Sequence, residues 1–333
     1  MDLSSSYLGL ALQSPLIASA SPLTGDVAVI RRMEDAGVGA VVLPSLFEEQ
    51  IRAEEQLVEA FTAESAESNP EATSYFPAAV TRSHGPSRYL DLVARARAAV
   101  DIPVIASLNG STTAGWVDYA RQIERAGASA LELNIYRIVS DPQVSGTQAE
   151  ADCVALVSAV RRCVAIPLSV KLHPHYSAFG AMARSLRLAG ANGLVLFNRV
   201  YQPDIDLVGV RWSNTISLSR ADEIRLGLLW VSELSGRLPG VSVAAGTGVE
   251  SAEQIIKYLL AGADAVMTTS SLLRHGPEHV ATLLDDLRSW LAASGFSSVA
   301  EIRGLLRRED HGAEARERTD YIESLTTYRL GSS

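Results

Sequence analysis

The sequence repeats one short segment four times, and an apolar run follows each copy. The copies contain Ala-Gly and span Ala36–Ala40, Ala126–Ala130, Ala189–Gly193 and Ala261–Ala265. Glycine ends helices well because it adopts the left-handed backbone that a helix C-terminus needs. A short apolar run directly after such an end is typical of a buried parallel strand. The repeat therefore predicts helices that alternate with core strands, as in a parallel α/β fold.

The chain contains eight apolar runs of the length of a strand. Some follow the Ala-Gly segments, and two follow Ile102-Pro103 and Ile166-Pro167, where proline ends the preceding helix. Helical patterns separate the strands, as at Gly115–Arg125, Ala149–Arg162 and Ala252–Leu260. This alternation favours a closed (β/α)8 TIM barrel over an open sheet. The predicted strands are Leu16–Ala20, Ala40–Leu43, Val104–Leu108, Leu131–Asn134, Leu168–Leu172, Gly193–Phe197, Val241–Ala245 and Ala265–Thr268.

Two connections are longer than a barrel loop and one helix require. We expect residues 45–100 and 199–219 to form lid-like excursions at the C-terminal mouth of the barrel, where barrel enzymes keep their active sites. A helical stretch at Val299–Leu306 and a charged tail over residues 307–333 extend the C-terminus. A length of 333 residues fits one domain with insertions, so residues 1–333 are predicted to form a single barrel.

Charge and composition argue against several classes of protein. A net charge of −9 disfavours nucleic-acid binding, which needs clustered lysine and arginine. The N-terminus does not resemble a signal peptide, and no apolar run approaches the roughly 20 residues that cross a membrane. Cys153 and Cys163 fall on different turns of a predicted helix, too far apart for a disulfide. We therefore expect a cytoplasmic protein without a membrane or nucleic-acid partner.

Glycines and hydroxyl residues follow the last two predicted strands. Gly246-Thr247-Gly248 comes after the seventh strand, and Thr269-Ser270 comes after the eighth. Loops at these positions cradle phosphate in many barrels, because glycine lets backbone N–H groups approach the anion and hydroxyls add donors. Two tight turns that bind nothing are the alternative. The position of both segments favours a phosphate site.

Lys171, Asn134 and Asn198 lie at the ends of three other predicted strands. Alternation along the strand places Lys171 on the same face as Ser169. A lysine inside a barrel needs an anion or an electron-rich ring to face it. The side-chain amides of Asn134 and Asn198 would donate hydrogen bonds to a planar ligand and accept them from it. A surface lysine and solvated loop asparagines are the alternatives.

His173 and His175 follow Lys171 directly. A metal site would need further ligands, and no carboxylate or third histidine stands at a comparable strand end. We therefore predict no metal. A contact for proton transfer or substrate and an ordinary loop position both remain open for these histidines.

In this order, the strand-end segments resemble the dihydroorotate dehydrogenase family of FMN-dependent barrels. The resemblance covers most of the chain, from Ser14 to Ile302. Each segment alone is weakly specific, but their order is distinctive. The matching segments are Leu131–Asn134, Ser169–Leu172, Phe197-Asn198, Ala245–Ser251 and Leu259–Pro277.

The resemblance implies an FMN cofactor and a place for it. Lys171 would face the N1/O2 edge of the isoalloxazine and stabilise negative charge on the reduced flavin. Asn134 and Asn198 would hydrogen-bond flavin or substrate, and the last two loops would hold the phosphate. The residues implied to bind the cofactor are Ala18, Ser19, Ala20, Ser45, Asn134, Lys171, Asn198, Gly246, Thr247, Gly248, Thr269 and Ser270.

The substrate half of the site departs from the family. A family lysine after the second strand is replaced by Pro44-Ser45, and the asparagines that hold the substrate carboxylate are missing from Tyr75–Ala78. The family's Asn-Leu-Ser-Cys-Pro-Asn segment carries a Cys or Ser base. Here that segment reads Asn134–Val139 and offers neither.

The changed loops offer substitutes for the lost groups. Dihydroorotate oxidation needs a base to remove a proton while hydride goes to the flavin. Tyr136 and His173 are the candidate catalytic residues beside Lys171. Arg137 and Arg199 could grip a substrate carboxylate through paired hydrogen bonds, together with Asn134 and Asn198.

We therefore expect an FMN-dependent oxidoreductase that oxidises or reduces a CH–CH bond of a small carboxylated substrate. The family's own reaction is dihydroorotate to orotate, in pyrimidine biosynthesis. One alternative is a phosphate-sugar aldolase or isomerase with a Schiff base on Lys171. Another is a non-catalytic flavin-binding partner protein. The resemblance favours a homodimer. Because the sequence has no Cys cluster for an iron–sulfur centre, electrons would leave through an electron-transfer partner protein or a soluble acceptor.

Overall fold

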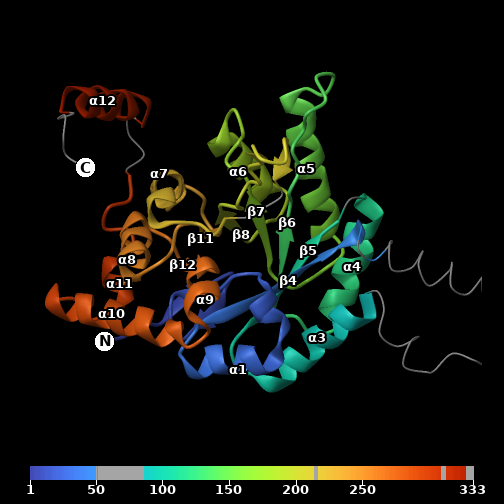
Figure 1. Ribbon diagram of the computed structural model, residues 1–333, viewed down its shortest axis with the longest axis horizontal. Helices are drawn as coiled ribbons and strands as arrows, with labels where there is room; N and C mark the ends of the chain where they lie inside the picture. The colour runs from blue at the N-terminus through green and yellow to red at the C-terminus, as the bar shows by residue number, and fades with distance from the viewer. Residues whose placement is uncertain (50, 52–85, 111, 214–216, 309–312, 328–333) are drawn as a thin grey trace, which may run out of the picture.

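A closed barrel of eight parallel strands forms the centre of the molecule (Figure 1). The structure is a computed structural model that describes residues 1–49, 51, 86–110, 112–213, 217–308 and 313–327. Neighbouring strands follow one another around the barrel in chain order, which confirms the predicted (β/α)8 fold. The strands are β3 (Leu16–Ala18), β4 (Ala40–Phe47), β5 (Val104–Asn109), β6 (Ala130–Asn134), β7 (Leu168–Leu172), β8 (Gly193–Leu196), β11 (Ser242–Ala245) and β12 (Ala265–Thr268).

Helices surround the barrel and pack against one another in sequence. All four Ala-Gly segments lie between a helix and the next strand. Their glycines, Gly37, Gly127, Gly190 and Gly262, have φ values of 97°, 92°, 103° and 111°, as the helix-end interpretation requires. The helices are α1 (Val27–Asp35), α3 (Pro86–Ala99), α4 (Thr113–Arg125), α5 (Gly146–Arg161), α6 (Phe179–Leu188), α7 (Ile224–Leu234), α8 (Ala252–Ala261), α9 (Ser270–His275), α10 (His279–Ala293), α11 (Val299–Ile302) and α12 (Ala313–Thr326), with short 3₁₀ turns at Pro22–Gly25 and Ala221–Glu223.

An apolar cluster fills the lower part of the barrel interior. The hairpin of β1 (Ser5–Tyr7) and β2 (Leu10–Leu12) closes the floor, because Leu8 and Ser5 bond to residues at the starts of β11 and β12. Tyr7 is fully buried there. Polar residues can therefore gather only higher in the barrel, toward the C-terminal ends of the strands. The members of the inner cluster are Tyr7, Leu8, Leu12, Ile17, Ala40, Val42, Ile105, Ala130, Val195, Ala244, Ala265 and Met267.

The second strand runs farther than predicted. β4 continues past Leu43 to Phe47, and its pairing with β5 shifts register between Val42 and Ser45. Pro44 stands at this shift, where a missing backbone donor is tolerated. Ser45 therefore belongs to the barrel wall and not to the excursion predicted over residues 45–100. The middle of that excursion, Glu64–Thr73, lies outside the described residues.

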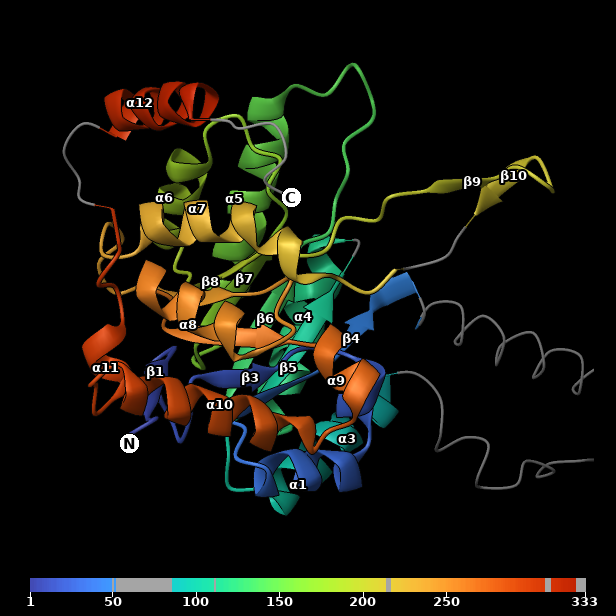
Figure 2. The ribbon, with the colours of Figure 1, turned by 60° about the vertical axis from the view of Figure 1, so that its left-hand side comes forward.

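The excursion over residues 199–219 contains a second hairpin. Its strands are β9 (Asp204–Asp206) and β10 (Arg211–Ser213), paired antiparallel. Figure 2 shows the hairpin extending outward from the barrel. At the other end of the chain, the helical stretch predicted at Val299–Leu306 contains the short helix α11, and α12 lies within the residues predicted as a charged tail. Among the described helices, none has the length and apolar character needed to span a membrane.

Candidate active site

A row of hydrogen-bonded polar side chains runs across the upper barrel, from β4, β5 and β6 to the residue that follows Phe197 after β8. The hydroxyls of Ser45 and Ser107 are 2.8 Å apart. Asn134 donates from Nδ2 to Ser45 Oγ at 3.2 Å, and Asn198 donates from Nδ2 to Asn134 Oδ1 at 2.6 Å. These bonds fix the orientation of both amides. The structure therefore brings Ser45, Asn134 and Asn198 together.

Lys171 points into the barrel beside this row. Its register partner on β6 is Asn134, and only 13% of its side chain is exposed. Its ammonium donates to Ser19 Oγ at 3.4 Å, after β3. Nζ also lies 3.9 Å from Oε1 of Glu132. A buried ammonium with these neighbours can stabilise an anion placed at the mouth.

The loops after β11 and β12 continue around the mouth from β8, the strand with which β11 pairs. Thr247 and Gly248 both have φ of 73°, and Gly246 lies between them and β11. The Thr247 hydroxyl donates to the Phe197 carbonyl at 3.1 Å. Thr269 precedes α9, and the hydroxyls of Ser270 and Ser219 are 2.8 Å apart. Consecutive left-handed residues turn backbone N–H groups toward one side, which suits a phosphate.

The donor set at the mouth fits an FMN molecule. A cation and two oriented amides lie at the end of β6, β7 and β8, while glycine turns and hydroxyls follow β11 and β12. Ala18 and Ser19 are buried between these two groups, with Ala20 partly buried beside them. A pocket of about 190 Å³ borders Asn198, Gly246 and Thr247.

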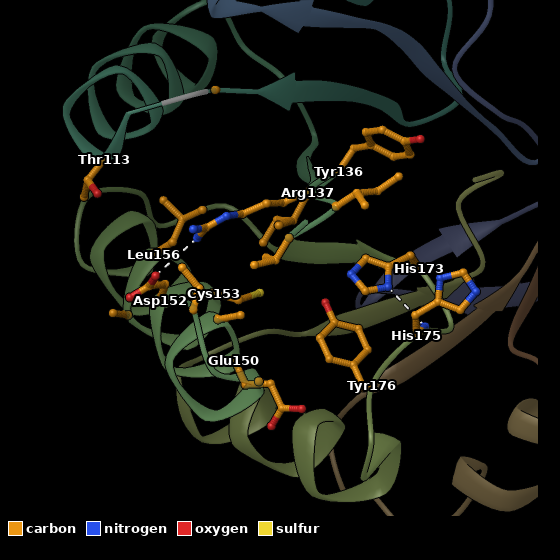
Figure 3. Close-up of a pocket in the computed structure, with 18 of the residues that line it drawn as sticks. Thr113, Tyr136, Arg137, Glu150, Asp152, Cys153, Leu156, His173, His175 and Tyr176 are labelled. Carbon is orange, nitrogen blue, oxygen red and sulfur yellow. Dashed lines mark hydrogen bonds and ion pairs between the residues drawn. The ribbon is translucent and has the colours of Figure 1, made fainter. Parts of the chain in front are cut away.

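The candidate catalytic residues lie beside a larger cavity of about 990 Å³ (Figure 3). Tyr136 accepts a hydrogen bond on its hydroxyl from the Tyr201 N–H at 3.0 Å. His173 Nδ1 accepts from the His175 N–H at 3.1 Å. The His173 ring stacks on Tyr176, with centroids 4.4 Å apart. Burial lowers the pKa of His173, and nearby His175 lowers it further, so His173 is neutral at neutral pH.

Both candidate substrate arginines already have a carboxylate partner. Arg137 donates to Asp152 at 3.2 Å, and Figure 3 shows it directed toward α5. Arg199 donates to Glu223 at 2.7 Å and to the Ser217 hydroxyl at 3.3 Å. A substrate carboxylate would have to share or displace these partners.

Sequence reasoning missed one charged residue near the site. Glu132 is fully buried in the barrel interior, two residues before Asn134 on β6. The alternation that predicted an inward Lys171 applies equally to Glu132, because its register partner is Ser169. The same signal would therefore have found it.

The chain is similar to known dihydroorotate dehydrogenases. The sequence model of the dihydroorotate dehydrogenase family matches residues 78–291. A putative dihydroorotate dehydrogenase A (fumarate) from Aeropyrum pernix is 30% identical over 315 residues, which cover 92% of this chain and 98% of the relative. The catalytic subunit of dihydroorotate dehydrogenase B (NAD(+)) from Bacillus pumilus is 32% identical over 61% of this chain and 67% of its own length.

These similarities favour the oxidoreductase interpretation over the aldolase or isomerase alternative. The extent of the match agrees with the order of motifs along the barrel. We conclude that this chain belongs to the dihydroorotate dehydrogenase family, whose members are flavin-dependent oxidoreductases that act on a CH–CH bond.

Proposed function

We propose that this protein binds FMN across the barrel mouth and oxidises or reduces a CH–CH bond of a small carboxylated substrate. Dihydroorotate is the first candidate, because the relatives are named for it. The observation that carries the proposal is Lys171, whose side chain is only 13% exposed, beside two oriented amides.

FMN, when bound, supplies a ring that takes up or releases hydride. Lys171 would hold the negative charge that accumulates on the ring edge, in a site with little water to screen it. Asn134 and Asn198 would orient ring or substrate, because their mutual hydrogen bond restricts both side chains. Ser45 supports this pair from β4 through its bond to Asn134.

The phosphate would lie against the turns after β11 and β12. Gly246, Thr247 and Gly248 would offer backbone N–H groups there. Thr269 and Ser270 would add hydroxyls from the start of α9. The interaction between Ser270 and Ser219 would link this end to the excursion over residues 199–219.

Tyr136 is the stronger candidate for proton transfer to or from the substrate. The Tyr201 N–H donates to the Tyr136 hydroxyl, so the hydroxyl proton is available to a substrate carbon that is being reduced, and in the oxidising direction the tyrosinate oxygen would accept the substrate proton. In neutral His173, the acceptor nitrogen Nδ1 is already bonded to the His175 N–H. His173 would therefore have to break that bond before it could accept a proton.

Arg137 and Arg199 are proposed to bind the substrate carboxylate by exchanging their present partners. An arginine presents paired N–H donors that match a carboxylate. Each arginine already forms an ion pair with an acidic side chain, and substrate binding would break that ion pair. Binding would therefore be selective for substrates whose further contacts compensate for the broken ion pair. This altered substrate half is the reason to test more than one substrate.

Electron acceptor, assembly and cellular location are part of the proposal. The named relatives include both a fumarate and an NAD(+) type, so the acceptor differs within the family. We propose a homodimer, with an electron-transfer partner protein where the acceptor is not a soluble molecule. Cys153 and Cys163 are both free thiols, which supports a reducing cytoplasm.

The test is the absorption spectrum of the purified protein, followed by anaerobic titration with dihydroorotate. We expect a flavin band that bleaches on addition of substrate. A flavin band that persists with dihydroorotate but bleaches with another carboxylated substrate would redefine the substrate. A colourless protein that cannot be loaded with FMN would overturn the proposal, and trapping of a phosphate sugar on Lys171 by borohydride would then support the aldolase alternative.

A further inference from the structure

Three polar side chains form a level row inside the barrel, one layer below Lys171 and Asn134. Ser107 on β5, Glu132 on β6 and Ser169 on β7 are register partners. All three are fully buried. Below them lies the apolar cluster of the barrel floor. Glu132 is therefore a carboxyl group enclosed between an apolar floor and the cofactor layer.

Glu132 is poorly satisfied in this position. Neither of its carboxylate oxygens has a hydrogen-bond partner, and the same is true of the Ser169 hydroxyl and the Tyr7 hydroxyl. An isolated buried carboxylate is costly, so such a group is expected to neutralise or to pair with a cation. Burial raises the pKa of Glu132, although the ammonium of Lys171 partly lowers it.

Lys171 lies between this carboxyl group and the mouth. Its Nζ is 3.9 Å from Glu132 Oε1, beyond hydrogen-bond distance, while it donates upward to Ser19. The ammonium of Lys171 therefore lies between the Glu132 carboxyl group below it and the mouth of the barrel above it. We propose that Glu132 is a buried counter-ion of Lys171 that takes up a proton when an anion at the mouth draws the ammonium away, and releases it when the anion leaves.

The proton balance is simple. One proton enters from solvent and forms the O–H bond of the Glu132 carboxylic acid, and the positive charge of Lys171 is then available to the anion alone. The hydroxyls of Ser107 and Ser45, 2.8 Å apart, lead from the Glu132 row to the mouth. The other titratable groups near Glu132 are Tyr7 and Tyr89, whose pKa values burial raises, so both stay neutral.

This inference rests on the proposed function, since the anion in question is the flavin ring after reduction. It makes Glu132 a positioning residue that acts through Lys171. It predicts that reduction of the protein-bound flavin is coupled to one proton more than the flavin itself requires.

The first test is the pH dependence of the flavin midpoint potential, measured in the loaded protein by spectroelectrochemistry. The reduction equilibrium of the wild type should change by a further tenfold per pH unit relative to Glu132→Gln, which corresponds to about 30 mV per pH unit for two electrons. Ser169→Ala is the matched control, because it alters the same row without a titratable group. It should keep the wild-type slope. Equal slopes in the wild type and Glu132→Gln would overturn the inference.

The second test is infrared difference spectroscopy of the loaded wild-type protein, which needs no variant. A carbonyl band of a protonated carboxyl group should appear on reduction and shift in heavy water. Its absence would overturn the inference even if Glu132→Gln did not fold. Failure of the proposed function has a different signature, because the protein would then show no flavin absorption at all.

Discussion

Lys171 and Lys257 are the only lysines in the sequence, and they occupy opposite environments. Lys257 lies on the surface of α8, where it pairs with Glu253 and 47% of its side chain is exposed. Lys171 is largely enclosed at the barrel mouth. Arginine serves nearly everywhere else as the cation of this chain. A compact ammonium at position 171 is what an anionic ring edge between β6, β7 and β8 would require.

Replacement of Lys171 tests this role directly. Lys171→Gln should slow flavin reduction by about 10²- to 10³-fold, because one donor aimed at developing charge is lost. FMN should remain bound through the phosphate turns. Stopped-flow absorption measures the rate, and Lys257→Gln is the control that should react at the wild-type rate. An unchanged rate in Lys171→Gln would remove Lys171 from the mechanism.

Replacement of Tyr136 tests the proton-transfer step. Tyr136→Phe keeps the ring and removes the hydroxyl that Tyr201 N–H bonds to, so substrate-dependent reduction should fall by about 10²- to 10⁴-fold. Reduction by dithionite, which needs no proton from the substrate, should be unaffected. His173→Gln is the companion variant. If it loses the activity while Tyr136→Phe keeps it, the role belongs to His173.

At the scale of elements, the turn between β11 and α8 combines a left-handed backbone with a close backbone contact. Gly248 has φ of 73°, and a Cβ there would lie 2.9 Å from the Arg220 carbonyl oxygen and 2.9 Å from the Ile224 nitrogen. Both contacts are backbone atoms, one before the 3₁₀ turn Ala221–Glu223 and one at the first residue of α7, so they cannot move independently. Gly127, with φ of 92°, has open space around the equivalent position.

A comparison of Gly248 and Gly127 separates the cost of a left-handed backbone from the cost of a steric clash at Cβ. Gly248→Ala should lower the free energy of unfolding by about 1–3 kcal/mol and weaken FMN binding, because the turn must shift. Gly127→Ala should cost about 1–2 kcal/mol from its left-handed backbone alone and leave FMN affinity unchanged. Urea denaturation and FMN titration measure the two effects. Equal FMN affinity in both variants would argue against a phosphate site at Gly248.

The elements were predictable because their signals are local. A helix end at Gly127 or Gly262 depends on one backbone conformation that the residue itself favours. The extension of β4 through Pro44 was not predictable, because it depends on pairing with β5, far away in the chain. The partners of Arg137 and Arg199 are also contributed by distant helices and turns. Alternation along β6 carries the signal for Glu132, which lies in the middle of the strand and not at its end.

At the scale of the whole molecule, the barrel interior has an apolar part and a polar part, which contribute differently to stability. The floor is apolar and stabilises the fold by excluding water. The layer above holds Glu132 and Lys171, which stabilise the fold less than apolar side chains of the same size would. A buried ionisable pair retained inside a barrel therefore indicates function at the expense of stability.

The burial of Glu132 predicts how the free energy of unfolding changes with pH. Burial raises the pKa of Glu132 above its usual value of 4.5, so between that value and the folded pKa the native protein holds a proton that the unfolded chain has released, and above the folded pKa Glu132 is the ionised counter-ion of Lys171. Its contribution is fully present below pH 4.5 and is lost as the pH rises toward the folded pKa, by about 1.4 kcal/mol per pH unit. Glu132→Gln has no carboxyl group that can titrate at this position. Chemical denaturation should therefore show its free energy of unfolding increasing relative to that of the wild type above pH 4.5. Glu253→Gln, exposed on α8, should follow the wild-type profile. Parallel profiles for the wild type and Glu132→Gln would mean that Lys171 keeps Glu132 ionised throughout, and the row beneath the mouth would then be a permanent ion pair.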